Sequence, residues 1–353
     1  MCLRIVRRNY KNIFFGIGII VLILMVIQLD FTQVWAGVRH AGYWFVAVVL
    51  LWAFLYVFNT TSWWLIIHST LHRSSLPALH TKNSSAPRSS SPRLSPFWLY
   101  KVTVAGFALN YATPGGLMGG EPYRIMMLSP KIGTERASSS VILYVMTHIF
   151  SHFWFWLLSI PLFFIIHQPT TVTILIAVAM ATFCTTAIWF FMKGYKRGLA
   201  VRGMDLLRHI PYIKKWAIPF INDHKQQLDR IDQQIAALHN QNPRTFWSAV
   251  GLELLCRICS AAEIMFILLV LMPCVNYIDC ILIISFTTLI ANMLFFMPLQ
   301  LGGREGGFLM SITGLGLGLT PEAALNAAIF VALLVRVREL IWTAIGLMLI
   351  KTK

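Results

Sequence analysis

Two short motifs combine glycine, glutamate and arginine inside otherwise apolar stretches of the chain. The first, PGGLMGGEPYR, contains Glu121 and Arg124, and the second, PLQLGGREGGF, contains Arg304 and Glu305. Glycines let a ligand approach the backbone, and a helix N-terminus offers N–H donors to an anion. Because guanidinium binds phosphate through two hydrogen bonds, both motifs predict a site for an anionic phosphate group.

The two motifs hold four of ten charges that lie within apolar stretches. These ten are Glu121, Arg124, Glu253, Arg257, Glu263, Arg304, Glu305, Arg336, Arg338 and Glu339. Charges inside a bilayer are costly unless they are paired or hydrated, so they indicate function. The spacing of Glu253 and Arg257 places them on one helix face. An alternative is that such neighbouring pairs only neutralise one another and hold a helical bundle together.

The predicted substrate-binding site contains both motifs and two arginines of the last apolar run. Its members are Asn110, Pro114, Gly119, Gly120, Glu121, Arg124, Gly302, Gly303, Arg304, Glu305, Arg336 and Arg338. The arginine of each motif is expected to contact phosphate, with Arg336 or Arg338 assisting. The glutamate of each motif is expected to pair with arginine when the site is empty, and either glutamate could carry a proton.

Metal and catalytic chemistry have weaker support in the sequence. His148 and His152 have a metal-compatible spacing of four residues, but a third ligand is not evident. Asp229 and Asp232 lie in a basic amphipathic stretch and do not form the carboxylate pair that binds a metal-bound nucleotide. We therefore predict no catalytic residue, no metal site and no cofactor.

The elements that position these residues are predicted to be membrane helices. Of 353 residues 57% are hydrophobic and 12% are charged, whereas soluble domains carry about 25% charged residues. Six apolar runs are long enough to cross a bilayer of about 30 Å: 13–29, 43–67, 137–166, 171–192, 246–272 and 322–350. The first run follows a charged flank and is expected to be a retained signal anchor.

Two further apolar regions, 97–128 and 277–319, are interrupted by glycine and proline around the two motifs. Helix breakers at membrane depth leave backbone groups unpaired unless that backbone faces protein or water. We therefore predict that both regions are re-entrant hairpins lining a cavity. The fold class is thus an all-α polytopic membrane protein with about six spans and two broken-helix hairpins.

The net charge of +16 suggests nucleic acid as a partner only in a soluble protein. With the N-terminus inside, 23 of the 29 Lys and Arg residues fall on the inner side of the membrane, and Arg39 is the one basic residue outside. This bias predicts cytoplasmic N- and C-termini. Because the basic residues are explained by membrane orientation, we predict membrane lipids as the partner and not nucleic acid.

The chain is predicted to form one membrane domain, 1–353, with two halves, 1–166 and 171–350. Each half reads as span, span, hairpin, span, and three crossings per half give the halves opposite orientations. This inverted repeat is typical of secondary transporters, whose sites lie near the midplane. The matching positions are Pro114 with Pro298, Gly119 with Gly303, and Glu121 with Glu305.

Two polar segments complete the organisation. Residues 73–96 are rich in serine and proline and are predicted to be a disordered inner loop. Residues 193–245 are predicted to be a cytoplasmic segment with an amphipathic helix that either packs on the protein or lies on anionic lipid.

Three features of the sequence resemble the lysylphosphatidylglycerol synthase transmembrane (flippase-like) family. They are the pattern of Asn110, Pro114, Gly119, Gly120, Glu121 and Arg124, the later PLQLGGREGG, and the arginine-bearing last apolar run. This family is the membrane half of the bacterial multiple peptide resistance factor and also occurs in standalone form. The resemblance implies a bacterial inner-membrane protein that moves or exposes an anionic phospholipid or a polyprenyl-phosphate-linked lipid. Tyr144, Thr147 and His148 stand where an acidic–arginine pair would be expected, so the lipid species does not carry over.

The leading hypothesis is therefore a lipid flippase or translocase. The first alternative is a membrane-embedded glycosyltransferase or aminoacyltransferase, but the soluble aminoacyl-transferring domain of the full synthase has no counterpart in this sequence. The longest soluble segment, 193–245, is too short for an independent domain. The second alternative is a non-transporting partner of a separately encoded lipid-modifying enzyme.

Overall fold

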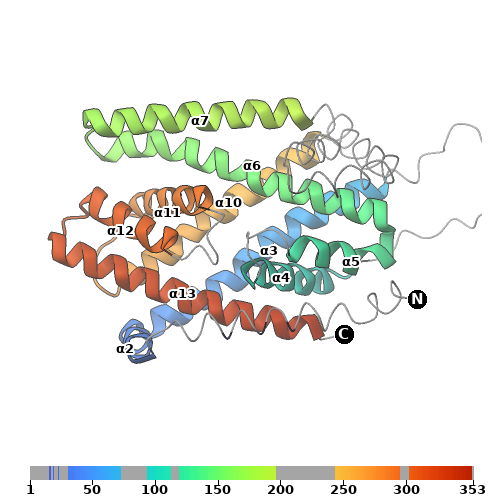
Figure 1. Cartoon of the computed structure of the whole chain (residues 1–353), viewed down its shortest axis with the longest axis horizontal. Coiled ribbons are helices and arrows are strands. Elements are labelled where there is room, and N and C mark those ends of the chain that lie inside the picture. The colour runs from blue at the N-terminus through green and yellow to red at the C-terminus, as the bar shows by residue number, and fades with distance from the viewer. Residues whose placement is uncertain are drawn as a thin grey trace, which may run out of the picture.

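The computed structural model describes residues 16, 19, 23, 31–72, 94–112, 119–195, 243–294 and 302–351. All regular elements in these ranges are helices (Figure 1). They are α2 (Phe31–Ala41), α3 (Tyr43–His72), α4 (Pro96–Ala112), α5 (Gly120–Ile132), α6 (Thr134–Ile166), α7 (Thr171–Tyr195), α10 (Pro243–Leu268), α11 (Tyr277–Met293), α12 (Gly303–Leu315) and α13 (Pro321–Lys351).

Three helices of the described chain are long and apolar enough to cross a membrane. These are Tyr43–Ser69 within α3, Thr134–Ile166, and Thr171–Met192 within α7. The helices α10 and α13 have comparable lengths of 26 and 31 residues, but they contain six of the ten predicted membrane charges. The structure thus supports a helical membrane protein and places a helix at five of the six predicted spans. The first predicted span, 13–29, lies largely outside the described residues.

Each interrupted region contains two shorter helices. The region 97–128 contains α4 and α5, of 17 and 13 residues, and the region 277–319 contains α11 and α12, also of 17 and 13 residues. In Figure 1, α4 and α5 lie toward the end of the bundle where α13 ends, and α11 and α12 lie toward the opposite end. Pro114 and Pro298, which the sequence placed in the turns, lie outside the described residues.

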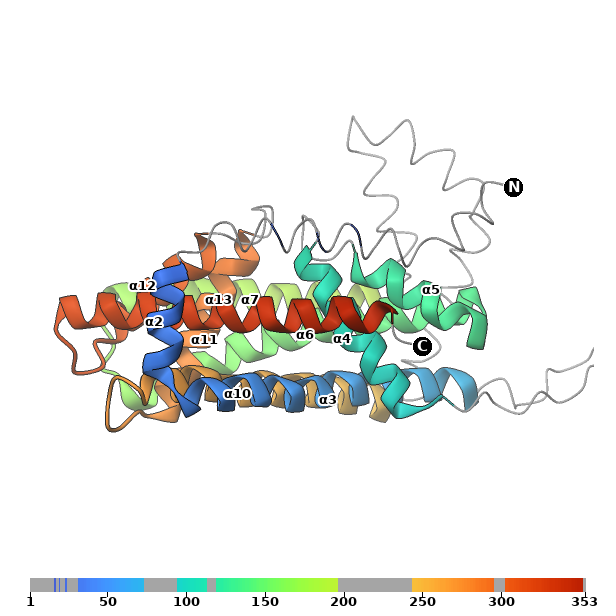
Figure 2. The same cartoon turned by 90° about the horizontal axis from the view of Figure 1, so that it is seen from below.

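The helices of the two halves pack in matching ways. The long helices α3 and α10 lie side by side, and they form one layer in Figure 2. The helix α4 packs on α13, and α11 packs on α6. Within each half, the second short helix packs on the long helix that follows it: α5 on α6, and α12 on α13.

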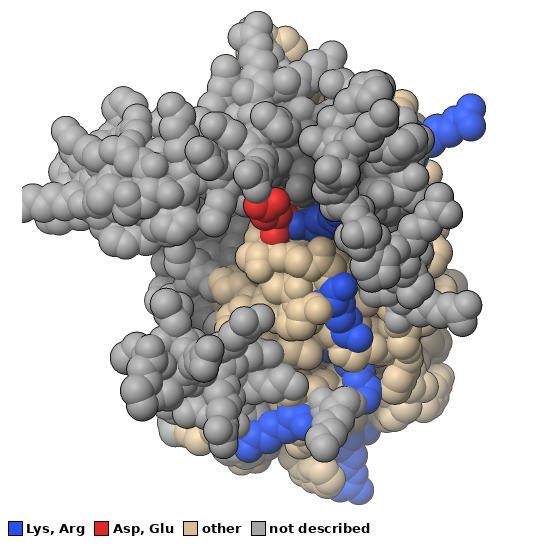
Figure 3. Space-filling view, turned by 90° about the vertical axis from the view of Figure 1, so that its right-hand side faces the viewer, with Lys and Arg blue, Asp and Glu red and all other residues tan. Residues whose placement is uncertain are grey.

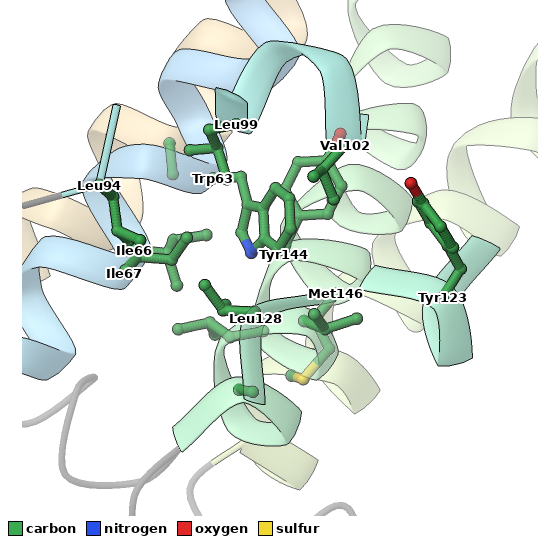
Figure 4. Packing of buried hydrophobic residues seen from close by; sticks show 14 of the residues in the cluster. Trp63, Ile66, Ile67, Leu94, Leu99, Val102, Tyr123, Leu128, Tyr144 and Met146 are labelled. Atoms are coloured by element: carbon green, nitrogen blue, oxygen red, sulfur yellow. The ribbon is translucent and has the colours of Figure 1, made fainter. Parts of the chain in front are cut away.

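Two apolar clusters occupy the two ends of this bundle. The first contains Trp63, Leu128 and Tyr144, which converge from α3, α5 and α6 (Figure 4). The second contains Phe155, Phe308 and other side chains of α6 and α10 to α13. Their burial stabilises each hairpin against the long helices by the hydrophobic effect.

Polar and charged side chains lie between these clusters. Among the buried members of the clusters, those of α10 change from the first cluster to the second between Val250 and Ala261, and those of α13 change from the second to the first between Val335 and Leu347. Polar residues in the middle of the long helices include Trp52, Tyr56, Asn59, His148, Ser151, Glu253, Arg257, Glu263, Arg336, Arg338 and Glu339. The bundle therefore has a polar layer at mid-height, between the two apolar clusters.

One end of the bundle is basic. It is the end at which α13 stops and α6 and α10 begin, and Lys and Arg are spread over this face in Figure 3. The described basic residues on helices at this end are Lys101, Lys131, Arg136, Arg244 and Lys351. Most of the predicted loop 73–96 and of the predicted segment 193–245 lies outside the described residues, and the last residue of that loop, Pro96, already belongs to α4.

Candidate functional site

Asn110 holds the first motif in place from the end of α4. Its side-chain oxygen accepts a hydrogen bond from the backbone N–H of Gly120 at 2.7 Å, and its Nδ2 donates to Glu121 Oε1 at 3.0 Å. Gly120 approaches α4 so closely that a Cβ there would lie 2.6 Å from Asn110 Oδ1 and closer still to the carbonyl oxygen of Gly106. Glycine is therefore required at this crossing. The N–H of Gly120, expected to be a free anion donor, is already occupied.

Arg124 pairs with Glu121 as its spacing predicts, with 3.1 Å between Nη1 and Oε1. Its guanidinium carbon lies 4.7 Å from the ring centroid of Phe107, 5.2 Å from that of Tyr144 and 6.0 Å from that of Trp63. Only 1% of the Arg124 side chain is exposed, against 15% for Glu121. An aromatic cage thus closes around the cation, and Arg124 holds the hairpin together in this structure without facing an open site.

The second motif pairs differently from the sequence prediction. Arg304 does not pair with its neighbour Glu305 but with Glu339 of α13, and Glu305 pairs with Arg336 at 2.6 Å. Arg336 also lies 3.7 Å from Glu339. The cause is geometric: adjacent residues on a helix point in different directions, so each charge of α12 meets a partner on α13. Gly302 is the N-cap residue that precedes this helix, with φ +80°, and it donates its N–H to Glu305 Oε2 at 2.9 Å.

Arg338 forms the most buried ion pair of the polar layer. Its Nε and Nη2 donate to the two carboxylate oxygens of Glu263 on α10, at 2.7 and 3.0 Å. Trp52 of α3 donates from its indole N–H to the same carboxylate at 3.0 Å, and its ring lies 3.9 Å from the guanidinium carbon. At most 2% of either charged side chain is exposed. This closed set links three helices.

Exposure separates the charges that a ligand could reach from those it could not. The exposed side-chain fractions are 22% for Arg304, 40% for Glu305 and 10% for Arg336. Glu339, by contrast, is 2% exposed. The end of α4 connects this accessible group to the first motif. The guanidinium carbon of Arg304 lies 5.9 Å from the ring centroid of Tyr111, and Asn110, which holds the first motif, precedes Tyr111 in the chain.

Glu253 and Arg257 do not form the local pair that their spacing suggested. Glu253 instead lies 2.7 Å from Nδ1 of His148 on α6. Arg257 donates to Ser151 Oγ and to the carbonyl oxygen of His148, both at 2.8 Å. In the described part of the chain, no group of three or more His, Cys, Asp or Glu residues could hold a metal ion.

The hairpin geometry, with a caged arginine in one half and an interhelical charge network in the other, accompanies a match over nearly the whole sequence. The family model described as lysylphosphatidylglycerol synthase TM region matches residues 13–345. The chain belongs to this family. Searches of curated proteins and of solved structures gave no match.

Family membership and the helical spans indicate a multi-pass membrane protein with a function related to membrane lipids. In this member of the lysylphosphatidylglycerol synthase transmembrane family, sequence reasoning missed the roles of Trp52, Tyr111 and His148. The aromatic rings gave no signal because the chain contains 12 Trp and 10 Tyr residues. Their position in the middle of long helices, at the height of the embedded charges, is the feature that could have singled them out.

Proposed function

We propose that the protein is a lipid flippase that moves an anionic phospholipid or a polyprenyl-phosphate-linked lipid across the inner membrane. The observation that carries this proposal is the partly exposed group of Arg304, Glu305 and Arg336 at mid-height, next to fully buried ion pairs. The headgroup phosphate would bind Arg304 and Arg336, while the acyl or prenyl chains stay in lipid.

Charge balance supports exchange at this site. Glu305 is the most exposed partner of an embedded arginine, and it binds Arg336 through one oxygen. A phosphate that replaces this carboxylate leaves the charge of the site nearly unchanged. Binding therefore avoids the cost of an unpaired cation in a low-dielectric interior. Asn110, Glu121 and Arg124 would position the first hairpin against the site without contacting phosphate.

The matching packing of the two halves supports an inverted repeat. Under this reading α4–α5 and α11–α12 are re-entrant hairpins that enter from opposite sides and meet at the polar layer. Alternating access around a midplane site is the motion that such repeats allow. The basic end of the bundle would face the cytoplasm, in line with the positive-inside rule.

The test is reconstitution in liposomes that contain a headgroup-labelled anionic phospholipid, with label accessibility recorded over time. Arg304→Gln and Arg336→Gln should each slow movement about tenfold to hundredfold, because a charged hydrogen bond contributes about 1.5–3 kcal/mol. Arg39→Gln is the matched control, since Arg39 is exposed on α2, and it should move lipid at the wild-type rate.

Two results would contradict the proposal. Equal rates for wild type and Arg304→Gln at equal incorporation would remove the proposed site. Wild-type protein that moves no lipid above empty liposomes would instead favour a non-transporting partner of a lipid-modifying enzyme.

A further inference from the structure

Glu253 differs from the other embedded glutamates in its partner. Glu121, Glu263, Glu305 and Glu339 each form an ion pair with an arginine. Among the described residues, the ionisable partner within ion-pair distance of Glu253 is His148, with 2.7 Å between Oε2 and Nδ1. Histidine is the side chain whose charge changes near neutral pH. This pair can therefore change its charge where the arginine pairs cannot.

The second oxygen of Glu253 is unsatisfied. Oε1 is buried without a hydrogen-bond partner in the described part of the chain, and 1% of the side chain is exposed. Buried carboxylate oxygens are normally hydrogen-bonded, so an orphaned one requires an explanation. His148 is 26% exposed and can exchange protons with water that enters the polar layer. The carboxylate is thus reachable through the imidazole.

The groups that face this pair come from several helices. Tyr144 and His152 lie on α6, Cys256 and Arg257 on α10, and Arg124 on α5, while Arg304 of α12 acts on His152, one turn after His148. The helices α3 and α4 contribute the neutral side chains Asn59 and Phe107. Arg257 donates hydrogen bonds to two groups of α6, the hydroxyl of Ser151 and the backbone carbonyl of His148. The pair therefore lies near Arg124 of the first motif and one turn from His152, which senses Arg304 of the second motif, so its charge acts on an anion bound at mid-height.

We propose that His148 and Glu253 form a proton-binding site that couples proton uptake to headgroup binding; this inference rests on the proposed function. With neutral His148 and ionised Glu253, the pair carries one negative charge, and Nδ1–H donates to Oε2. One proton taken from water by the imidazole converts the pair to imidazolium and carboxylate, with no net charge. An anionic headgroup then binds next to one negative charge fewer, so proton and headgroup each favour binding of the other.

The first experiment tests the proton site without any lipid substrate. Infrared difference spectra of the purified full chain are recorded between about pH 8 and about pH 5, which bracket the ordinary pKa of histidine at about 6.5. We expect imidazole or carboxyl bands that disappear in both His148→Gln and Glu253→Gln. These substitutions keep a hydrogen bond between the two positions but remove one titrating group. Wild-type bands that persist unchanged in both variants would overturn the proposal.

The second experiment tests coupling. Proton uptake by the protein in lightly buffered detergent is followed with a pH indicator while a short-chain anionic phospholipid is added. Wild type should take up protons on binding, and its lipid affinity should rise at least about fivefold from about pH 8 to about pH 6. Glu253→Gln should bind lipid without proton uptake and with little pH dependence.

The matched control is Asp279→Asn. Asp279 accepts from His167 at 2.8 Å in a second histidine–carboxylate pair between α6 and α11, and His167 ends α6 far from the polar layer. Its loss should leave lipid-linked proton uptake intact. If wild type binds and moves lipid without taking up protons, the coupling alone is refuted. If wild type moves no lipid, the proposed function is refuted, and the infrared spectra still decide whether the proton site exists.

Discussion

Gly120→Ala provides a direct test of how the first hairpin is built. The new Cβ would lie 2.6 Å from Asn110 Oδ1, and the backbone of Gly106 lies closer still. Ordinary van der Waals contact begins at 3.4 Å, so α5 must move away from α4 by about 1 Å to reach the separation at which packed atoms normally rest. The obstruction is backbone, which a change of rotamer cannot relieve.

The displacement breaks two hydrogen bonds of Asn110, those to Gly120 N–H and to Glu121. Each contributes about 1 kcal/mol, and overpacking adds about 1–3 kcal/mol. We therefore expect Gly120→Ala to lower the free energy of unfolding by about 3–5 kcal/mol. It should also reduce lipid movement, because the same contacts hold α5 against the end of α4, where Tyr111 meets Arg304.

The assay is unfolding in mixed micelles with increasing denaturing detergent, followed by tryptophan fluorescence. Gly306→Ala is the control, because a Cβ at Gly306 meets nothing within 4 Å, and alanine favours a helix over glycine by up to about 1 kcal/mol. The control should be as stable as wild type or slightly more stable. A Gly120→Ala protein with wild-type stability would show that α4 and α5 do not cross as closely as described.

Three further predictions concern the charge network and the packing of α13. Arg338→Met should destabilise the protein by about 3–5 kcal/mol because it leaves Glu263 buried without its cation, whereas the double variant Arg338→Met, Glu263→Met should recover most of that loss. Unfolding of both variants in mixed micelles measures the difference. Equal losses of stability in the two variants would contradict a bidentate pair. Glu305→Gln should bind a short-chain anionic phospholipid several-fold more tightly than wild type in a titration, because Arg336 loses a competing carboxylate; weaker binding would place Glu305 among the headgroup contacts. Gly346→Ala should destabilise the protein more than Gly251→Ala, since its Cβ would lie 2.5 Å from Ala108 Cβ of α4 while Gly251 is open; unfolding curves in the opposite order would refute the α4–α13 crossing.

The sequence was sufficient to predict where the long helices lie. Apolar runs longer than a bilayer gave the positions of α3, α6 and α7, and glycine and proline marked the region of each broken element. The family was also predictable from the first motif and is confirmed by the match to residues 13–345. These features are local in sequence, so a single chain reveals them.

Most partners of the embedded charges of α10, α12 and α13 were not predictable; the exception is Glu339, which lies 3.7 Å from Arg336 and 3.9 Å from Arg338 of its own helix. Periodicity gives the face of a helix on which a charge lies, but not the helix that packs against that face. Arg338 and Glu263 are 75 residues apart, and only tertiary packing brings them together. The pair of Glu121 and Arg124 was predicted correctly because both residues belong to one short helix.

The correspondence between the two motifs also shifts by one residue when it is judged by structure. Gly120 and Gly303 are both first helical residues, and both face the end of the preceding helix: Gly120 faces Asn110, and Gly303 faces Ala291 and Leu294. Gly120, and not Gly119, is therefore the structural counterpart of Gly303. Glu121 is then the second residue of α5 and Glu305 the third residue of α12, so their side chains point in different directions and meet different partners.

The two hairpins differ in where glycine lies at their close crossings. In the first, both helices contribute one: Gly120 of α5 lies against Gly106 of α4, and Gly106 makes room for the guanidinium of Arg124. In the second, Gly307 of α12 lies against Thr287 of α11. Separating α5 from α4 would pull a caged cation away from its aromatic rings, whereas α12 could slide over α11 between small side chains at lower cost. The accessible charges Arg304 and Glu305 also lie on α12. Movement between states of the proposed transport cycle is therefore expected in the second hairpin, with the first hairpin held fixed by Arg124.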